Sequence, residues 1–228
     1  MTNDTATYKQ LAGTAAAELI EDGMVIGLGS GSTAAFLVRA LGERLRKGLH
    51  IAGAVPSSQE TAQLAASLGI PLVSLETHPV LDLAIDGADE IDPQLNLIKG
   101  GGGALLREKI VATSARQFVV IADSSKLVPR LCTRAALPVE VVPFALGPVR
   151  RRLEALGASV QQRVREGRPF ITDNQNYILD CSFPGGITDP TSLQTQIRAV
   201  VGVVEHGLFL GITERALVAG PNGLLTLP

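Results

Sequence analysis

The chain has 228 residues, 46% of them hydrophobic, and a formal net charge of −2 at pH 7. This length allows one large domain or two smaller ones with packed cores. There is no basic excess, and the densest basic stretch, Val149 to Leu156, is typical of a solvated helix face, so the composition argues against a protein that binds nucleic acid.

The cysteines, the histidines and the N-terminal region exclude further classes of protein. Cys132 and Cys181 are far apart and lack a CxxC pairing, so we expect two buried core thiols in a reducing compartment. His50, His78 and His206 are isolated and lack the spacing of a metal site. No apolar stretch approaches the ~20 residues that cross a bilayer, and the first residues lack a secretory pattern, so we expect a cytoplasmic protein without a membrane partner.

The first 130 or so residues alternate between helical and strand patterns. Buried apolar strands that alternate with helices indicate a parallel sheet with helices on both faces, a Rossmann-like α/β fold. Ser32 or Thr33 is expected to cap the second helix. In chain order the predicted elements are a helix at Thr5–Leu19, a strand at Met24–Gly29, a helix to Lys47, a strand at His50–Ser58, a helix at Gln59–Leu68, strands at Pro71–Glu76 and Leu81–Glu90, a helix at Gly103–Gln117 and a strand at Phe118–Lys126.

After Arg130 the order of elements predicts a different, smaller domain. The order βαβ-βαβ is typical of a ferredoxin-like α+β domain. Its predicted elements are Leu137–Ala145, Gly147–Leu156, Ser159–Val164, the hairpin Pro169–Phe183, a helix from Pro190 to Val200 capped by Asp189, and a strand at Gly202–Leu210. We assign the tail Arg215–Pro228 to the first sheet. The predicted α/β domain is therefore 1–131 with 206–228, and the small domain, inserted near the C-terminus, is 132–205.

Four polar stretches are predicted at one edge of the parallel sheet. They are Gly29–Thr33, Asp86–Glu90, Lys99–Gly103 and Ala122–Lys126. Ligands of such sheets bind beyond the carboxyl ends of the strands. We therefore expect these stretches to form one binding site.

The stretch Gly29–Thr33 combines glycines with three hydroxyl side chains. The glycines do not match GxGxxG, because residue 32 is serine, and no Walker loop occurs, so a nucleotide-dependent kinase or dehydrogenase is disfavoured. Hydroxyls beside free helix amides suit a small anion such as one phosphate. A plain helix cap after a tight turn explains the stretch equally well.

The stretch Lys99–Gly103 contains four consecutive glycines. Each costs about 0.5–1 kcal/mol relative to alanine in regular structure, so a plain loop rarely needs so many. Bare backbone lets a ligand approach the amide groups, and Lys99 supplies positive charge for an oxygen that becomes negative. The alternative is a flexible connector.

Several charged residues near these stretches have both a functional and an ordinary explanation. Glu108 lies early in a helix and either turns back to the sheet edge or only interacts with the helix dipole. Asp86 and Asp89 either bind a ligand or are turn residues, and their spacing lacks the pattern of an EF-hand calcium loop. Lys126 by itself is typical of a solvated lysine.

The motifs "GLGSGSTA", "DGADEID", "IKGGGGALLREKI" and "IADSSK", with "LPVEVVPFA" and "TDNQNYILD", resemble the ribose-5-phosphate isomerase family of the A type over nearly the whole chain. The resemblance implies an enzyme of the pentose phosphate pathway that interconverts ribose 5-phosphate and ribulose 5-phosphate through an enediolate. It also implies that no metal or organic cofactor is required and that the protein is a homodimer.

The resemblance further implies a role for each matching residue. Glu108 is the base that moves a proton between C1 and C2, and Lys99 faces the oxygens that carry developing charge. Asp86 and Asp89 bind sugar hydroxyls, and Asp86 also helps to open the furanose ring. The other implied contacts are the amides of Gly100, Gly101 and Gly102 at the charged oxygens, Gly87 and Ala88 at the sugar, and Ser30, Gly31, Ser32, Thr33, Lys126 and Lys9 at the phosphate.

The sequence departs from the family pattern at two places. Gln175 stands where the family often has glycine, so we expect a strained hairpin or another turn type. The stretch Gly211–Gly220 differs from the usual aspartate-containing tail. An alternative function is a non-catalytic sugar-phosphate sensor on the same scaffold, but no helix-turn-helix segment is attached and a sensor needs no base at Glu108.

Overall fold

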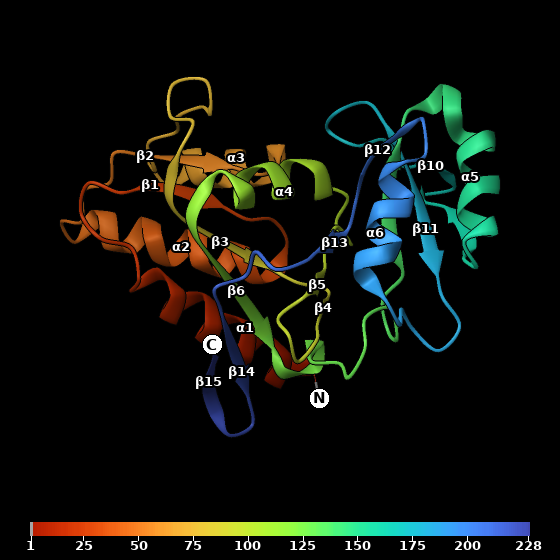
Figure 1. The fold of residues 1–228 in the computed structure, drawn as a ribbon. Coiled ribbons are helices and arrows are strands. Elements are labelled where there is room, and N and C mark those ends of the chain that lie inside the picture. The colour runs from red at the N-terminus through yellow and green to blue at the C-terminus, as the bar shows by residue number, and fades with distance from the viewer. Residues whose placement is uncertain (1) are drawn as a thin grey trace. The chain divides into compact units, whose positions relative to one another are not determined.

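The structure is a computed structural model that describes residues 2–228, with side chains from residue 4 onward. The chain divides into two compact units (Figure 1). The first unit contains the chain up to Ala88, Arg107–Lys126 and Ile212–Pro228, and the second contains Asp89–Leu106 and Leu127–Gly211.

The first unit is built on a six-stranded sheet in the order β15-β14-β6-β3-β1-β2. All neighbouring pairs are parallel except β14 with β15. The predicted Rossmann-like parallel sheet is confirmed, and so is the return of the C-terminal tail to it. The elements are α1 (Thr2–Ala17), β1 (Val25–Leu28), α2 (Ser32–Arg46), β2 (Gly53–Pro56), α3 (Gln59–Ser67), β3 (Leu81–Gly87), α4 (Leu105–Thr113), β6 (Ala115–Asp123), the 3-10 turn η1 (Ser124–Lys126), β14 (Arg215–Gly220) and β15 (Gly223–Leu227).

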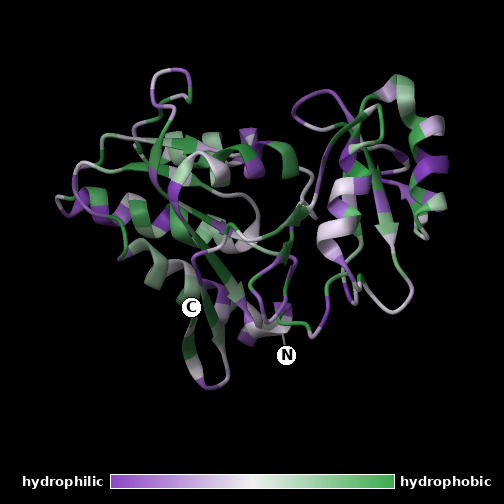
Figure 2. Ribbon diagram, in the orientation of Figure 1, coloured by the Kyte–Doolittle hydropathy of each residue, from purple (hydrophilic) through white to green (hydrophobic). Residues whose placement is uncertain are grey.

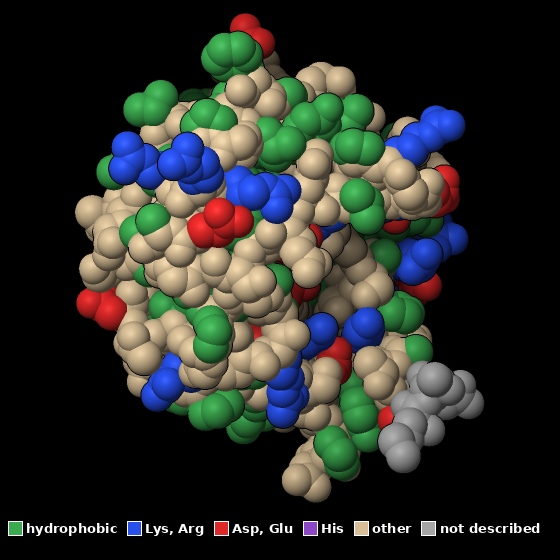
Figure 3. Space-filling view, turned by 90° about the vertical axis from the view of Figure 1, so that its right-hand side faces the viewer, with side chains coloured by type: hydrophobic (Ala, Val, Ile, Leu, Met, Phe, Trp, Pro, Cys, Tyr) green, Lys and Arg blue, Asp and Glu red, His purple; other side chains and the backbone are tan. Residues whose placement is uncertain are grey.

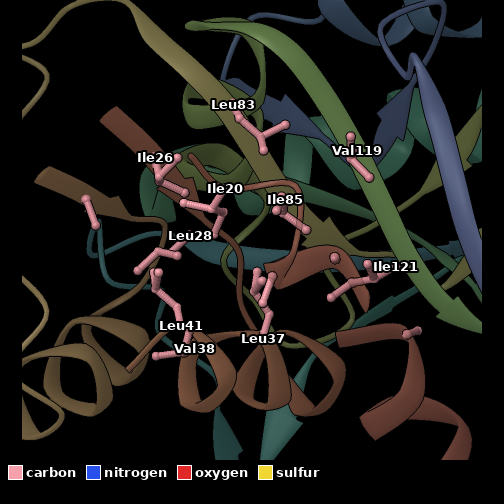
Figure 4. Close-up of a cluster of buried hydrophobic side chains, with 14 of the residues drawn as sticks. Ile20, Ile26, Leu28, Leu37, Val38, Leu41, Leu83, Ile85, Val119 and Ile121 are labelled. Atoms are coloured by element: carbon pink, nitrogen blue, oxygen red, sulfur yellow. The ribbon is translucent and has the colours of Figure 1, made fainter. Parts of the chain in front are cut away.

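Side chains from α1, α2 and the sheet form the main core of the first unit (Figure 4). Ile26 and Leu28 alternate with Gly27 along β1 and therefore share one face of the sheet. They pack in the same cluster as Leu37 and Leu41, which are four residues apart on α2. Burying one such side chain stabilises the fold by about 1.5–3 kcal/mol.

Gly27 faces the other side of the sheet, where α4 packs. A Cβ atom at this position would lie 2.5 Å from Cγ1 of Val111 and 2.9 Å from Cβ of Ala84. Glycine therefore lets the helix approach β1 closely. Figure 1 shows α4 on the opposite side of the sheet from α1 and α2, so helices cover both faces as predicted.

The second unit contains a four-stranded antiparallel sheet in the order β12-β7-β11-β8. With α5 after β7 and α6 after β11, this is the predicted ferredoxin-like arrangement. Asp189 caps α6 as predicted, because its side chain accepts from the Ser192 amide and Pro190 follows at the first helical position. The elements are β4 (Glu90–Ile91), β5 (Leu97–Ile98), β7 (Leu137–Val141), η2 (Pro143–Ala145), α5 (Leu146–Ala155), β8 (Ser159–Gln162), β9 (Val164–Arg165), β10 (Arg168–Pro169), β11 (Tyr177–Ser182), α6 (Pro190–Arg198), β12 (Val203–His206) and β13 (Leu208–Phe209).

The turn before β11 is strained, as the sequence predicts. Gln175 has a φ of 64°, in the left-handed region that favours glycine. The turn is held by the fully buried Glu140 of β7, whose Oε1 accepts from Thr172, Asn174 and Asn176. These three bonds explain how a non-glycine residue is kept in this conformation.

Several predicted elements are wrong. The predicted hairpin 169–183 does not form, because β10 pairs with β9, whereas β11 pairs with β7 and β8. Pro71–Glu76 forms no strand, because it meets β2 only through a bridge between Ala54 and Leu72. The predicted helix 103–117 ends at Thr113, and β6 begins at Ala115. The predicted strand 202–210 is divided at Gly207, whose amide donates to the Pro138 carbonyl, and the two parts pair in different sheets.

The units also differ from the predicted domain boundaries. Residues 89–106 group with the second unit, because β4 and β5 form a three-stranded sheet with β13. Residues 127–131 and 206–211 belong to the second unit as well. Local patterns place β4 and β5 next to β3 in the sequence but do not show which distant strand they pair with.

The distribution of hydrophobic and hydrophilic residues matches these helices and strands. Figure 2 shows hydrophobic residues along the strands and a mixture of hydrophobic and hydrophilic residues along the helices. This is the pattern of sheets that are covered by amphipathic helices. None of the helices in the described part of the chain is both long enough and apolar enough to span a membrane.

Candidate active site

In the first unit the polar stretches follow strands that end at one edge of the sheet. Strands β1, β3 and β6 are parallel neighbours in this sheet. The turn Gly29–Gly31 follows β1, Asp86 and Gly87 end β3, and Lys126 ends the 3-10 turn after β6. Ala88 comes next after β3. The sequence prediction of a shared edge therefore holds for the stretches that belong to this unit.

The turn after β1 leads directly into α2. Gly31, with a φ of 89°, is the residue before the helix, and no side chain caps the helix at this position. The predicted cap by Ser32 or Thr33 is wrong, because both residues already lie within α2. A helix whose first amides lack a side-chain cap offers them to an anion. Lys9 adds positive charge at the turn, since its Nζ donates to Ser32 Oγ at 2.9 Å.

Asp86 ties the turn to the end of β3. Its Oδ1 accepts from the amide of Ser30 at 2.9 Å and from the amide of Gly87 at 2.7 Å. The carboxylate is almost fully buried. A Cβ atom at Gly29 would lie 2.0 Å from this oxygen, so the position requires glycine. The Asp-Gly pair therefore ends β3 and also holds the turn after β1 in place.

A group of hydroxyls that was not predicted from the sequence also contacts this turn. Ser57 is fully buried and its Oγ lies 2.7 Å from Ser30 Oγ. Thr61 Oγ1 donates to the Gly29 carbonyl at 3.0 Å. The available signal was the position of Ser57 directly after β2, at the same edge of the sheet.

Glu108 lies in the first turn of α4 and is 5% exposed. The end of this helix is close to the beginning of β3, since the Leu81 amide donates to the Ser114 carbonyl at 2.9 Å. The helix therefore begins towards the carboxyl edge of the sheet. Val111 faces Gly27 of β1, and Glu108, three residues earlier, shares that face of the helix. Its carboxylate is thus directed to the inner side of α4, near the edge that carries the turn.

In the second unit the turn Lys99–Gly103 follows β5. Lys99 is 2% exposed, and its ammonium lies 5.3 Å from the centre of the Phe209 ring, within the range of a cation–π contact. Asp89 faces the turn, because its Oδ2 accepts from the Gly101 amide at 2.7 Å. The structure therefore brings Asp89 and the glycine turn together.

The glycines of this turn are required mainly by packing within the protein. A Cβ atom would lie 2.6 Å from Leu105 Cβ at Gly100, 2.6 Å from Asp89 Oδ1 at Gly101 and 2.4 Å from the Phe170 ring at Gly103. Only Gly102 among the four has no atom within 4 Å of that position. The turn is therefore closely packed and is not a flexible connector, and Gly102 alone leaves open space.

Glu90, in the same "DGADE" motif, has a structural role that sequence analysis missed. It is buried and accepts from the amides of Cys132, Arg134 and Ala135. Three amide donors satisfy a buried carboxylate without a cation. Glu90 therefore holds the segment 132–135 against β4.

The cysteines are buried, as predicted, and lie in the second unit. Burial raises the pKa of Cys181 to about 12 and also raises the pKa of Cys132. Both side chains therefore act as small apolar groups at neutral pH. Within the described residues, no group of three or more His, Cys, Asp or Glu side chains is arranged to hold a metal ion.

Comparison with known proteins identifies the family of the chain. The family model for ribose 5-phosphate isomerase A (phosphoriboisomerase A) matches residues 53–223. Ribose-5-phosphate isomerase A of Synechococcus sp. (strain JA-3-3Ab) is 56% identical over 96% of this chain and 96% of the relative, and that of Roseiflexus sp. (strain RS-1) is 56% identical over 98% and 97%.

Two solved structures show the same fold. Ribose 5-phosphate isomerase A of Methanocaldococcus jannaschii has a TM-score of 0.92 at 42% identity and covers 97% of this chain and 98% of its own. A D-ribose-5-phosphate isomerase in complex with phospho-erythronic acid has a TM-score of 0.95 at 40% identity over 98% and 99% of the two chains. The chain belongs to the ribose-5-phosphate isomerase A family.

Proposed function

We propose that this chain interconverts D-ribose 5-phosphate and D-ribulose 5-phosphate through an enediolate, with Glu108 as the base. A proton on a carbon next to a carbonyl is weakly acidic, so the reaction needs a positioned base and stabilisation of the resulting oxyanion. Glu108 suits the first need, because its carboxylate is buried on the inner face of α4 near the carboxyl edge of the sheet.

Lys99 and the glycine turn supply the positive electrostatic environment. The buried ammonium of Lys99 and the backbone amide of Gly102 stabilise the oxygens that become negative in the enediolate. The Gly101 amide has a different task, since it already donates to Asp89. Asp86 and Asp89 bind sugar hydroxyls beside Gly87 and Ala88, and Asp86 assists ring opening.

The phosphate binds at the turn before α2. Ser30, Ser32 and Thr33 offer hydroxyls, the first turn of α2 offers amides, and Lys9 and Lys126 add positive charge. The phosphate takes no part in the bond changes. Its binding energy positions C1 and C2 at Glu108, which is the usual use of a remote group in catalysis.

The observation that carries this proposal is Glu108, a buried glutamate in the first turn of α4. In the same unit, α2 begins after β1 with hydroxyl side chains and without a side-chain cap. The test is incubation of the purified protein with ribose 5-phosphate, with and without EDTA. We expect ribulose 5-phosphate to form at the same rate in both samples, because the proposal requires neither metal nor organic cofactor. A protein that binds the sugar phosphate without forming ketose would instead be a sensor.

We also propose that the protein is a cytoplasmic homodimer. Two free buried cysteines suit a reducing compartment. The second unit exposes Phe144 completely and Val201 to 93%, and both line an apolar groove of about 820 Å³. Figure 3 shows exposed hydrophobic side chains on the face turned to the viewer. Such clusters on a surface commonly mark interfaces between proteins.

Light scattering tests the dimer. We expect twice the chain mass of 23.8 kDa and a shift towards the monomer in Phe144→Asp. A wild-type mass of one chain contradicts the proposal.

A further inference from the structure

Arg163 contacts the carbonyl side of the glycine turn in the second unit. Its Nη1 donates to the carbonyl of Gly100 at 2.9 Å and to that of Gly101 at 3.0 Å. No motif identified in the sequence includes this arginine. One guanidinium nitrogen therefore holds two successive peptide groups of the turn.

Asp180 fixes the guanidinium in place. Arg163 Nε donates to Asp180 Oδ2 at 2.9 Å, and Nη2 donates to Oδ1 at 2.5 Å. This paired geometry gives strong, directional bonds. Asp180 lies on β11, and the Arg163 amide donates to the carbonyl of Ile178 on the same strand, so both partners are anchored to the four-stranded sheet.

The aromatic ring of Phe170 completes this support. The Phe170 amide donates to the Arg163 carbonyl at 2.9 Å, and the guanidinium carbon of Arg163 lies 5.9 Å from the ring centre. The ring also occupies the space next to Gly103. The glycine turn is thus held from the side of β8 by one charged and one aromatic side chain.

Because each peptide group is planar, the bonds from Arg163 to the carbonyls also fix the amides on the other side of the turn. In a planar trans peptide the C=O and N–H groups point in opposite directions. The Gly100 carbonyl and the Gly101 amide belong to one peptide, and that amide donates to Asp89. The Gly101 carbonyl and the Gly102 amide belong to the next peptide, so holding the former directs the latter away from Arg163.

We propose that Arg163, anchored by Asp180, is a positioning residue that orients the Gly102 amide and the Asp89 carboxylate for the reacting sugar. The inference rests on the proposed isomerase function. Glycine restricts the backbone less than any other residue, so this turn needs an external contact to keep one orientation. Donors that are already oriented stabilise developing charge without reorganisation during the reaction.

The inference predicts a specific kinetic change. Arg163→Met should lower kcat by about 10- to 100-fold, the effect expected when catalytic groups are slightly misplaced. KM for ribose 5-phosphate and the inhibition constant of inorganic phosphate should change by less than about threefold, because the phosphate-binding residues lie in the other unit and remain intact. Arg163→Lys should recover part of kcat, since an ammonium can still donate to one carbonyl.

Arg130→Met is the matched control. Arg130 also belongs to the second unit and its Nη1 donates to the Gly185 carbonyl at 3.1 Å, away from the glycine turn. We expect wild-type kinetics in this variant. Melting temperatures of all variants separate a loss of folding from a loss of positioning. Asp180→Asn should also lower kcat. The double variant should be no worse than Arg163→Met, because Asp180 acts through Arg163.

The outcomes are separable. If the wild type forms no ketose, the proposed function fails. If the wild type is active and Arg163→Met retains wild-type kcat, or if Arg130→Met loses as much, the positioning role fails while the function stands. A folded Arg163→Met with lowered kcat, unchanged phosphate inhibition and partial recovery in Arg163→Lys supports the inference.

Discussion

The turn after β1 and the glycine turn after β5 both connect a strand to a helix, but they are stabilised differently. The first is supported by hydroxyls and by Asp86, which leaves the amides at the start of α2 available. The second is held on its carbonyl side by Arg163 and on its amide side by Asp89. A phosphate has a permanent charge and needs a matching set of donors, whereas an enediolate oxygen gains charge only during the reaction and needs donors that are already fixed.

The largest expected effect separates chemistry from binding. Glu108→Gln keeps the size of the side chain but removes the base, so kcat should fall by about 10²- to 10⁴-fold with KM little changed. Steady-state kinetics measure both. Glu60→Gln is the control, because Glu60 also lies in the first turn of a helix, α3, but is exposed. Equal losses in the two variants would mean that Glu108 only interacts with the helix dipole.

A smaller effect is expected from Gly101→Ala in the glycine turn. The new methyl group would lie 2.6 Å from Asp89 Oδ1 and would displace this carboxylate. We expect kcat to fall by roughly tenfold or more, since misplaced groups lose much of their effect. Gly147→Ala in α5, where no atom lies within 4 Å of the new methyl group, should leave kcat unchanged. Wild-type kcat in Gly101→Ala would contradict the role of Asp89.

Ser32→Ala tests the turn after β1, where the phosphate is proposed to bind, and should mainly change KM. It removes a hydroxyl that accepts from Lys9. A hydrogen bond to a charged group contributes about 1.5–3 kcal/mol, so KM should rise roughly tenfold or more. Ser67→Ala is the control, because that hydroxyl donates to the Leu64 carbonyl at the end of α3. A fall in kcat with unchanged KM would place Ser32 in the chemical step instead.

A smaller expected effect concerns the pH dependence of the free energy of unfolding. It comes from the cysteines, which lie in the second unit. Since the folded protein keeps the Cys181 proton up to a pKa of about 12 while the ordinary value is 9.0, the folded state binds more protons between these values. The free energy of unfolding should therefore fall as pH rises from 9 towards 12, by at most about 1.4 kcal/mol per pH unit from this group.

Urea unfolding at several pH values measures this dependence. Cys181→Ala should reduce the slope above pH 9. An unchanged slope, or rapid labelling of the native thiols near neutral pH, would contradict their burial. Because the first unit contains no cysteine, thiol labelling reports the opening of the second unit alone.

Local sequence patterns predict much of this fold for clear physical reasons. Short apolar runs that end in glycine or in small polar residues predict β1, β3 and β6, and parallel strands place their carboxyl ends at one edge. The residues at that edge in the first unit follow directly from this rule. The βαβ-βαβ order likewise predicts the ferredoxin-like sheet.

Contacts between distant residues could not be predicted in this way. Gly207 divides the last predicted strand because it packs against the Lys99 carbonyl, 108 positions away in the sequence. Arg163, which lies between β8 and β9, contacts the glycine turn, and Asp180 of β11 anchors this arginine. The residues next to Arg163 in the sequence give no indication of such a contact. The contacts of Arg163 that support the turn therefore become visible only in the structure.

The measurement that tests the central claim most directly is isomerisation of ribose 5-phosphate in D2O, followed by NMR of the product. Proton transfer by Glu108 through an enediolate exposes the abstracted proton to exchange, so ribulose 5-phosphate should carry deuterium at C1. Glu108→Gln should form this product at least about 100-fold more slowly. Ketose that carries no deuterium and forms at the wild-type rate in Glu108→Gln would contradict the account.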